Sequence, residues 1–453
     1  MLTFANLTRD TASDYLAEGL ADAIYTRLRE TGRFVLTSRT MVRRLPGVET
    51  LAPPALGRAL DAAYLVNGSV HAAAGRLRVD VECLRAADGR SVWADEFDRP
   101  QVDLLAIEEE IAIAVASQVA GRLDPSARRV LSARPTTSGA AYDLFYRGNY
   151  ALGQRSEASV MWARDAYATA RRIDPGFTAA LAREAYADAL CLAWNWRCGA
   201  APESLLQLGR NLAQEAVRGA PRHSDSWMAM GYMLLEQYDY QSIVVGEPSP
   251  ATFRAAFAAF RRSVALDSTN AEAWHQYATA ATYVDDSIAR AADRRALALD
   301  PARPITLNQL AWLEFVTRHL AAAERLTDSV LTLQPEAGYG KFMLARLRLA
   351  RGDTAGALRE APKDSFLWFT AALTGDSAGV ARECGTQSPA YWQAAVCYAL
   401  GGRGEELLVR IAAARPSAVL YWSLRQPELD PLRPDPRFQQ AFAAAREAAE
   451  ASR

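Results

Sequence analysis

A short phrase that ends a helix occurs three times between residues 266 and 335, and it constrains the fold more than any other feature of the sequence. The copies read Ala-Leu-Asp-Ser, Ala-Leu-Asp-Pro and Leu-Gln-Pro and end at residues 268, 301 and 335, at intervals of 33 and 34. Each copy closes an alanine-rich amphipathic stretch, and a proline just past a helix stops it because proline has no N–H to continue the hydrogen-bond ladder. Intervals of this length predict stacked pairs of antiparallel helices.

The pairs resemble tetratricopeptide (TPR) repeats in spacing and in composition. Small residues stand where the two helices of such a pair would cross closely, at Ala278, Ala289, Ala296, Ala311 and Ala323. Further pairs are predicted from residue 140 to about residue 415, with two longer intervals of 46 and 47 residues between Pro175, Pro221 and Ser268. The extra residues fall near 194–200 and 238–249, and we expect them to form loops on one edge of an all-α superhelix, an α-solenoid.

Residues 1–125 follow a different period. Leu77, Val79, Val81 and Cys83 alternate with charged residues, which is the two-residue repeat of a strand with one buried face. Strands are also expected at 2–6, 34–38, 64–71 and 91–97, and amphipathic helices at 14–29 and 104–123. The sequence therefore predicts a small α/β domain ahead of the helical repeats.

Four phrases in this domain resemble the TolB-like amino-terminal domain that precedes TPR repeats in bacterial signalling proteins. They lie at 4–7 (Phe-Ala-Asn-Leu), 15–20 (Tyr-Leu-Ala-Glu-Gly-Leu), 64–70 and 93–99 (Trp-Ala-Asp-Glu-Phe-Asp-Arg). The resemblance implies a module found behind a serine/threonine kinase, an adenylate cyclase or a CadC-like winged-helix regulator. The family's first strand begins a few residues earlier than Leu2, so we expect the chain to be clipped at its start. Glu18, Asp98 and Arg99 are candidate ligand-binding charges, with surface pairing as the simpler explanation.

Composition and period together predict four segments. These are a TolB-like α/β domain at 1–125, a linker at 126–139, TPR-type helical repeats at 140–415 and carboxy-terminal capping helices at 416–453. The linker contains Arg134-Pro135 followed by Thr, Ser and Gly, and limited proteolysis is expected to cut near it.

Charge and motifs point away from an enzyme. The 453 residues include 51 Lys and Arg and 52 Asp and Glu, and no basic stripe of the kind that binds nucleic acid stands out. The sequence motifs of serine hydrolases, zinc proteases, P-loop enzymes and kinases do not occur in it. Four scattered histidines and five cysteines without CxxC spacing predict neither a metal site nor a cofactor, and no catalytic residue is expected.

The cysteines and the termini give expectations about compartment. Most of the five cysteines are expected to be buried free thiols, with a Cys191–Cys198 bridge as the less favoured alternative. The sequence has no apolar run of membrane-spanning length and no export signal at its start. We therefore expect a cytoplasmic location, or a periplasmic one if the chain is the extracytoplasmic part of a longer membrane receptor.

A protein or peptide partner is expected in the concave groove of the repeats. Counting along the first helix of each pair places eight side chains on that wall: Met228, Tyr232, His275, Thr279, Asn308, Trp312, Phe342 and Arg346. Aromatic anchors and arginine carry much of the energy of protein interfaces, so this wall favours an extended or helical peptide over a polyanion. Four aromatic side chains near the two long loops are candidate further contacts: Trp194, Trp196, Tyr238 and Tyr240. The alternatives are a groove filled by the protein's own helix at 437–448, or a hydrated one.

The leading hypothesis is a non-enzymatic scaffold or sensor module of a bacterial signalling protein. One alternative is the detached regulatory half of a membrane serine/threonine kinase, adenylate cyclase or transcriptional regulator. The other is a small-ligand binder or enzyme that uses the amino-terminal domain.

Overall fold

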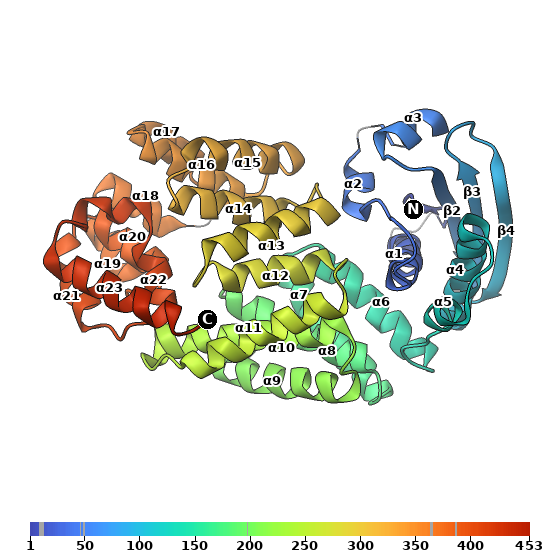
Figure 1. Ribbon diagram of the computed structural model, residues 1–453, viewed down its shortest axis with the longest axis horizontal. Coiled ribbons are helices and arrows are strands. Elements are labelled where there is room, and N and C mark those ends of the chain that lie inside the picture. The colour runs from blue at the N-terminus through green and yellow to red at the C-terminus, as the bar shows by residue number, and fades with distance from the viewer. Residues whose placement is uncertain (9–12, 46, 49, 197, 363–365, 386) are drawn as a thin grey trace. The chain divides into compact units, whose positions relative to one another are not determined.

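The computed structural model describes residues 1–8, 13–45, 47–48, 50–196, 198–362, 366–385 and 387–453 (Figure 1). The chain forms two compact units. Unit 1 comprises Met1–Met233 with the short stretches Ala265–Thr269 and Leu299–Ala302. Unit 2 comprises Leu234–Val264, Asn270–Ala298 and Arg303–Arg453.

Unit 1 begins with a four-stranded sheet in the order β1-β2-β3-β4. The strands are β1 (Ala5–Asn6), β2 (Tyr64–Ala73), β3 (Arg76–Arg85) and β4 (Ser91–Pro100). β1 pairs with β2 in parallel, and β2, β3 and β4 form an antiparallel meander. The meander confirms the three longer strands expected from the sequence.

Helices α1 (Asp14–Glu30) and α4 (Leu104–Ala120) cover one face of this sheet (Figure 1). Leu77, Val79 and Val81 of β3 are buried against them, whereas Arg78 and Asp80 between them are exposed. The two-residue period of the sequence thus corresponds to a strand with one buried face, and the predicted α/β fold of this region is confirmed.

Residues 34–38 are not a strand, and the prediction of one there is wrong. The chain instead enters α2 (Arg39–Arg44), where the Ser38 hydroxyl accepts a hydrogen bond from the Met41 N–H, and then α3 (Pro53–Ala59) before it reaches β2. The connection between the parallel strands β1 and β2 therefore contains the helices α1, α2 and α3. The two short helices were not expected because neither is long enough to show a clear 3.6-residue period.

The segment expected to be a linker contains a helix, α5 (Pro125–Leu131). Arg27 of α1 donates hydrogen bonds to two backbone carbonyls at the end of this segment, at 2.8 and 2.7 Å, and its guanidinium lies 3.5 Å from the buried carboxylate of Glu108. Tyr142, in the first repeat, belongs to the same apolar core as the sheet and donates a hydrogen bond to Glu108 at 2.7 Å. These contacts hold the segment against α1, and the domain boundary there stays a prediction.

The rest of the chain is helical. The next helices of unit 1 are α6 (Gly139–Gly153), α7 (Glu157–Ile173), α8 (Thr178–Ala193) and α9 (Pro202–Gly219). Two further helices, α10 (Ser224–Tyr240) and α11 (Pro250–Leu266), have residues in both units. The pairs that follow are α12 (Ala271–Ala281) with α13 (Asp286–Leu299), α14 (Pro304–Val316) with α15 (Leu320–Leu333), and α16 (Gly338–Ala350) with α17 (Thr354–Glu360). Shorter elements close unit 2: α18 (Leu367–Thr374), α19 (Ser377–Cys384), α20 (Trp392–Leu400), α21 (Gly404–Ala413), α22 (Ala418–Leu424), the 3₁₀ helix η4 (Pro427–Leu432) and α23 (Pro436–Glu450).

The repeat spacing corresponds to antiparallel helix pairs of the TPR type, which confirms the predicted α-solenoid. Residues 260–350, all of which are described, contain helices and turns but no strand. The alanines expected at the crossing points of the helices are fully buried: Ala278, Ala289, Ala296, Ala311 and Ala323. Close approach of paired helices therefore explains why small residues recur at this spacing.

The second long loop is shorter than expected. Helix α10 continues as far as Tyr240, and a π-helical turn, η3 (Gln241–Val245), follows it directly. The expectation of a loop from residue 238 is therefore wrong, because the aromatic and aliphatic residues of this stretch continue the helix.

Four of the five cysteines form two disulfides, Cys191–Cys198 and Cys384–Cys397. Cys83 is a buried free thiol in β3, and burial raises its pKa. The expectation that most cysteines are free is wrong, and the less favoured Cys191–Cys198 bridge is present. No helix among the described residues combines the length and the apolar character that a membrane crossing requires.

Candidate protein-binding surface

The eight predicted groove residues lie on the first helices of successive pairs, but most of them are buried. Met228 and Tyr232 lie on α10 in unit 1, and the other six lie on α12, α14 and α16 in unit 2. Thr279 and Trp312 are half-buried, whereas the remaining six are less than a tenth exposed. A binding role for these residues stays a prediction, and each of them already packs within its own unit.

Local contacts account for the burial of several of these residues. The ring of Tyr232 lies 5.6 Å from that of Tyr186. His275 lies 4.0 Å from Asp293, whose pKa is raised well above its ordinary value by burial. The Thr279 hydroxyl donates to the His275 carbonyl at 3.1 Å. These positions resemble a packed core more than an open peptide-binding wall.

Arg346 of α16 is the centre of the surface in unit 2. Its side chain is fully buried, and its guanidinium carbon lies between 4.6 and 5.9 Å from the centroids of four aromatic rings. The rings belong to Phe315, Trp312, Trp392 and Phe342. The electron-rich faces of aromatic rings attract a guanidinium, and its planar shape stacks on them.

Glu428 supplies the negative charge that the buried guanidinium requires. Nε and Nη2 of Arg346 donate to the two carboxylate oxygens of Glu428 at 2.7 and 2.8 Å, which is a bidentate ion pair. Nη2 also donates to the side-chain oxygen of Gln426 at 2.8 Å. The remaining nitrogen, Nη1, is buried and has no hydrogen-bond partner among the described residues.

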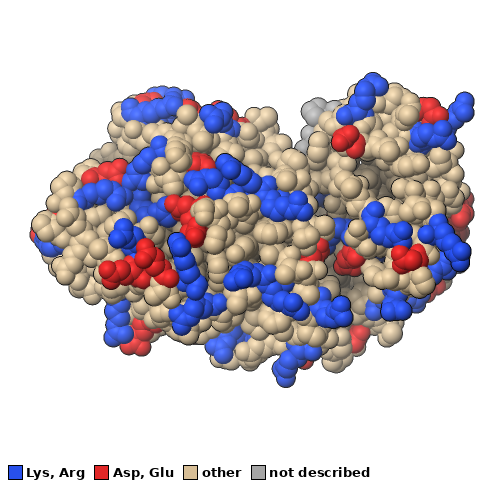
Figure 2. Space-filling view, in the orientation of Figure 1, with Lys and Arg blue, Asp and Glu red and all other residues tan. Residues whose placement is uncertain are grey.

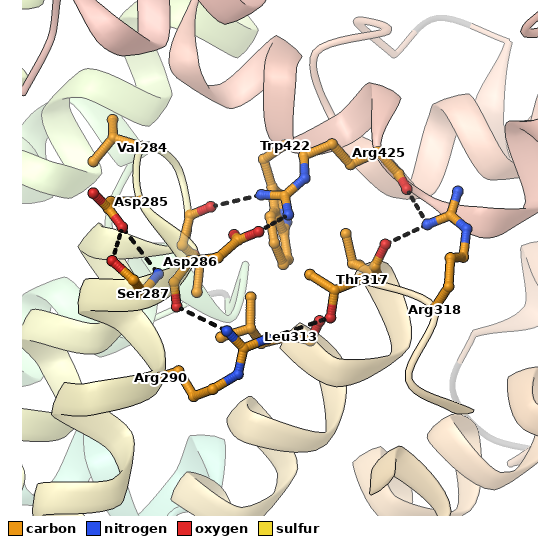
Figure 3. Close-up of polar contacts among 12 residues, drawn as sticks. Val284, Asp285, Asp286, Ser287, Arg290, Leu313, Thr317, Arg318, Trp422 and Arg425 are labelled. Atoms are coloured by element: carbon orange, nitrogen blue, oxygen red, sulfur yellow. Dashed lines mark hydrogen bonds and ion pairs between the residues drawn. The ribbon is translucent and has the colours of Figure 1, made fainter. Parts of the chain in front are cut away.

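Glu428 belongs to residues 418–433, which comprise α22 and η4 and which we call the strap. Figure 3 shows its residue Arg425 between two turns of the repeats. The Arg425 guanidinium pairs with Asp286 at the start of α13, and its backbone carbonyl accepts a hydrogen bond from Arg318, after α14, at 3.0 Å. Arg318 also donates to Asp430 at 3.2 Å. The strap therefore contacts the turns of two repeats and the inner helix of a third.

The ionisation of Asp430 follows from the same contacts. Burial opposes ionisation of this carboxyl, but hydrogen bonds from Arg318 and Arg433 outweigh it, so that the pKa of Asp430 lies below its usual value. The carboxylate is thus held charged at neutral pH.

Tyr238 contacts the strap rather than solvent. It lies in helix α10, not in a loop, and its hydroxyl accepts a hydrogen bond from the N–H of Ala418, the first residue of the strap, at 2.9 Å. Tyr240 is half-buried at the end of the same helix. The placement of these two residues in a loop is therefore wrong, and their role in binding stays a prediction.

Trp194 and Trp196 do lie in a loop, which the Cys191–Cys198 disulfide closes. Their rings stack with centroids 5.6 Å apart and planes 21° apart, and Trp194 is 42% exposed. A contact role for this pair stays a prediction.

The alternative in which residues 437–448 fill the groove stays a prediction. Residues 437–448 belong to α23, which packs on α21 and α22. The strap, which precedes α23, is the part of the carboxy-terminal region that reaches Arg346.

The candidate charges of the amino-terminal domain do not converge. Glu18 faces Arg43 at 3.6 Å, and Asp98 pairs with Arg76 at 2.7 Å on the exposed face of the sheet. Arg99 lies 3.6 Å from a glutamate of α4. Surface pairing thus accounts for all three. Among the described residues, no group of three or more His, Cys, Asp or Glu side chains is arranged as metal ligands.

Sequence reasoning missed the partners of Arg346 and the role of the strap. The phrase Pro-Glu-Leu-Asp-Pro at 427–431 is visible as a closing segment, but nothing within it indicates which helix it contacts. Two features of the sequence could have indicated this contact. The closing segment has two acidic residues two positions apart, and the predicted groove wall contains one arginine.

Charged side chains are mixed over the face of the molecule that Figure 2 shows. Lys and Arg lie among Asp and Glu on this face, in keeping with 51 basic and 52 acidic residues in the chain. The candidate surface is therefore distinguished by the ion pairs of the strap and not by an excess of positive or negative charge.

Comparisons with known proteins give partial likenesses. No family model matches the chain. Putative adenylate cyclase 3 of Rhizobium meliloti (strain 1021) is 28% identical over 221 residues, and the match covers 48% of this chain and 36% of that protein. The chain therefore spans about a third of the length of this curated relative.

Similar solved structures include a TPR protein. Yeast Tom70 is 15% identical, with 76% of this chain and 79% of that chain covered and a TM-score of 0.39. The human IFIT1 dimer with m7Gppp-AAAA is 10% identical, with 77% and 76% covered and a TM-score of 0.43. A thermophilic TPR protein of Thermus thermophilus is 18% identical, with 49% and 100% covered and a TM-score of 0.37. TM-scores this low carry no argument about function.

Proposed function

We propose that the chain is a non-enzymatic protein-interaction module, a scaffold or sensor of a bacterial signalling protein, which binds a protein or peptide partner on the inner helices of its TPR-type repeats. Helix pairs of this kind stack into extended concave surfaces, which such repeat proteins use for binding. Of the predicted groove positions, the proposal rests on those of unit 2, where Thr279 and Trp312 are half-buried, and it adds the strap as a segment that lies on part of this surface.

The observation that carries the proposal is the way in which unit 2 holds the strap. Arg346 binds residues 426–428 through a bidentate carboxylate contact and an amide contact, inside a ring of aromatic side chains. Aromatic and arginine anchors in a desolvated setting are the contacts that dominate protein–peptide recognition. The inner helices are therefore chemically equipped to hold a peptide segment.

A second candidate is that the chain is the regulatory half of a larger signalling protein. The partial match to a putative adenylate cyclase favours this reading, because the chain spans only 36% of that relative. The same reading assigns residues 1–125 to a TolB-like domain on the phrases quoted above. A kinase or a transcriptional regulator would be equivalent effectors under this proposal.

We propose a periplasmic rather than a cytoplasmic location, which the two disulfides support. Disulfides form and persist in oxidising compartments and are rare in the reducing cytosol of ordinary bacteria. This supports the alternative in which the chain lies outside the membrane of a receptor.

Site-specific photo-crosslinking tests the proposed function. A photoreactive amino acid at Thr279, half-buried on α12, should give a discrete crosslinked species in cells, whereas the same amino acid at Ser329, exposed on α15, should not. Mass spectrometry of the product identifies the partner and the bound segment. Equal products from both positions, or none from Thr279, would show that the inner helices are not the binding surface.

A further inference from the structure

We infer that the surface around Arg346 and Arg318 recognises acidic peptides whose two carboxylates are spaced two residues apart, and that the strap is its internal occupant. This inference rests on the proposed function and adds the chemistry of the ligand. It departs in part from the expectation drawn from the sequence, which favoured an extended or helical peptide over a polyanion.

The spacing of the two arginines matches that of the two acids. Arg346 lies on α16 and binds Glu428, while Arg318 lies in the turn after α14 and binds Asp430. Leu429, between the two acids, is fully buried. The recognition element is therefore Glu-x-Asp with an apolar residue in the middle.

The two ion pairs differ in their exposure to water. The side chains of Arg346 and Glu428 are 0% and 5% exposed, whereas those of Arg318 and Asp430 are 37% and 46% exposed. An exposed ion pair contributes little and exchanges readily with water and competitors. A competing peptide can therefore displace the strap first at Asp430 and then at Glu428.

Stability alone does not explain the buried ion pair between Arg346 and Glu428. Apolar side chains of similar volume often stabilise a protein as well as or better than a buried pair, because desolvation of the charges is costly. Four aromatic rings around Arg346 would suit such an apolar residue. The arginine instead commits the site to a carboxylate, and its unpartnered Nη1 leaves a donor for an acceptor that the strap does not provide.

The second arginine stands at the carboxy-terminal end of helix α14. Arg318 has a φ of +68°, a left-handed conformation that is unfavourable for a residue with a side chain. It caps the end of α14, where the His319 N–H donates to the Glu314 carbonyl at 2.8 Å, and from this position Arg318 contacts both Asp430 and the carbonyl of Arg425.

A labelled peptide tests the inference on the full chain. The probe is a fluorescein-labelled peptide with the sequence of residues 424–434, and its control carries Gln and Asn in place of the two acids. In the protein, Glu428→Gln with Asp430→Asn weakens the internal occupant and leaves both arginines in place. The matched variant, Glu405→Gln with Asp435→Asn, removes two acids that pair with Arg437 elsewhere in unit 2.

The expected result is an apparent affinity of the probe for the Glu428/Asp430 variant about 10-fold higher than for the unmodified chain or the matched variant. The apparent affinity scales with the fraction of surface that the strap leaves open, and loss of charge-assisted contacts raises that fraction. Adding Arg318→Glu to the variant should remove the gain. If the variant fails to fold by circular dichroism, Asp430→Asn alone, at the exposed end, should still raise the affinity about 3-fold, since an exposed pair is worth less than 1 kcal/mol or so.

Several outcomes would overturn the inference. Equal binding of the neutral peptide, no gain in either variant, or no effect of Arg318→Glu would each show that the acids are not what is recognised. Sedimentation that shows the variant as a dimer would make a second copy, not a partner peptide, the occupant. The crosslinking at Thr279 is independent of these results, so failure of the peptide leaves the wider proposal standing on its own test.

Discussion

Replacing Cys384 and Cys397 together by Ala should destabilise unit 2 by roughly 3 kcal/mol. The bridge joins α19 to α20 across a separation of 13 residues, and both cysteines are buried. A cross-link lowers the entropy of the unfolded chain by an amount that grows with the logarithm of the loop length, which gives about 3 kcal/mol for a loop of this size. The same calculation gives about 2.5 kcal/mol for the Cys191–Cys198 bridge, whose separation is 7 residues.

Thiol counting establishes whether the bridges exist in the isolated protein. Under denaturing conditions without reductant, one reactive thiol is expected, that of Cys83, and after reduction all five cysteines should react. Hydrogen–deuterium exchange measured by mass spectrometry then follows each unit separately. In the Cys384/Cys397 variant, protection should fall in α19 and α20, while the Cys191/Cys198 variant serves as the matched control with its loss in unit 1.

Five reactive thiols without reductant, in protein purified from an oxidising compartment, would refute both disulfides. The argument for a periplasmic location would fall with them, because it rests on the bridges. A variant that loses its bridge without any loss of protection would instead show that the entropy argument does not apply at that position.

Two more predictions concern buried groups. Burial raises the pKa of Asp239 from 3.8 to about 7, so the folded state binds this proton more tightly and stability falls as the pH rises from about 4 to about 7. Asp239→Asn should therefore reduce the pH dependence and add roughly 1–4 kcal/mol at about pH 8, as measured by urea unfolding at about pH 5 and pH 8; an unchanged slope would show that Asp239 does not contribute to it. Gly148→Ala should lower the stability of the protein by on the order of 1–3 kcal/mol, because the added Cβ would lie 2.6 Å from the buried ring of Tyr167. Gly209→Ala should lower it less, because its nearest contact, also at 2.6 Å, is the flexible end of Met233. Equal thermal shifts for the two variants would contradict this.

The sequence was informative wherever structure is encoded locally. Helix α15 ends at Leu333, two residues before the proline that marks it, and α13 ends at Leu299, just before the Asp-Pro of its phrase. Apolar periodicity and a residue that cannot continue a helix decide such ends within one turn. The same local information identified β3 from four alternating residues.

Contacts between distant segments could not be predicted in this way. Arg346 and Glu428 are 82 residues apart, and no periodic pattern relates them. The counting rule correctly put Arg346 on the first helix of its pair, but such a rule states which face a residue lies on and not what covers that face. The Cys384–Cys397 bridge is a similar case, because two helices must first pack before the two sulfur atoms meet.

The aspartate of the repeat-ending phrase also makes contacts with other parts of unit 1. In unit 1, three aspartates at equivalent positions each accept a hydrogen bond or an ion pair from the amino-terminal part of the chain. The contacts are Thr136 with Asp174, Arg29 with Asp267 at 3.2 Å, and Ser38 with Asp300 at 2.5 Å. A repeat array presents the same local position at regular intervals, which explains why these three acceptors share one place in their repeats. Within unit 1, a residue that ends a helix thereby also provides a carboxylate for the amino-terminal part of the chain, in contacts that add geometric specificity as well as energy.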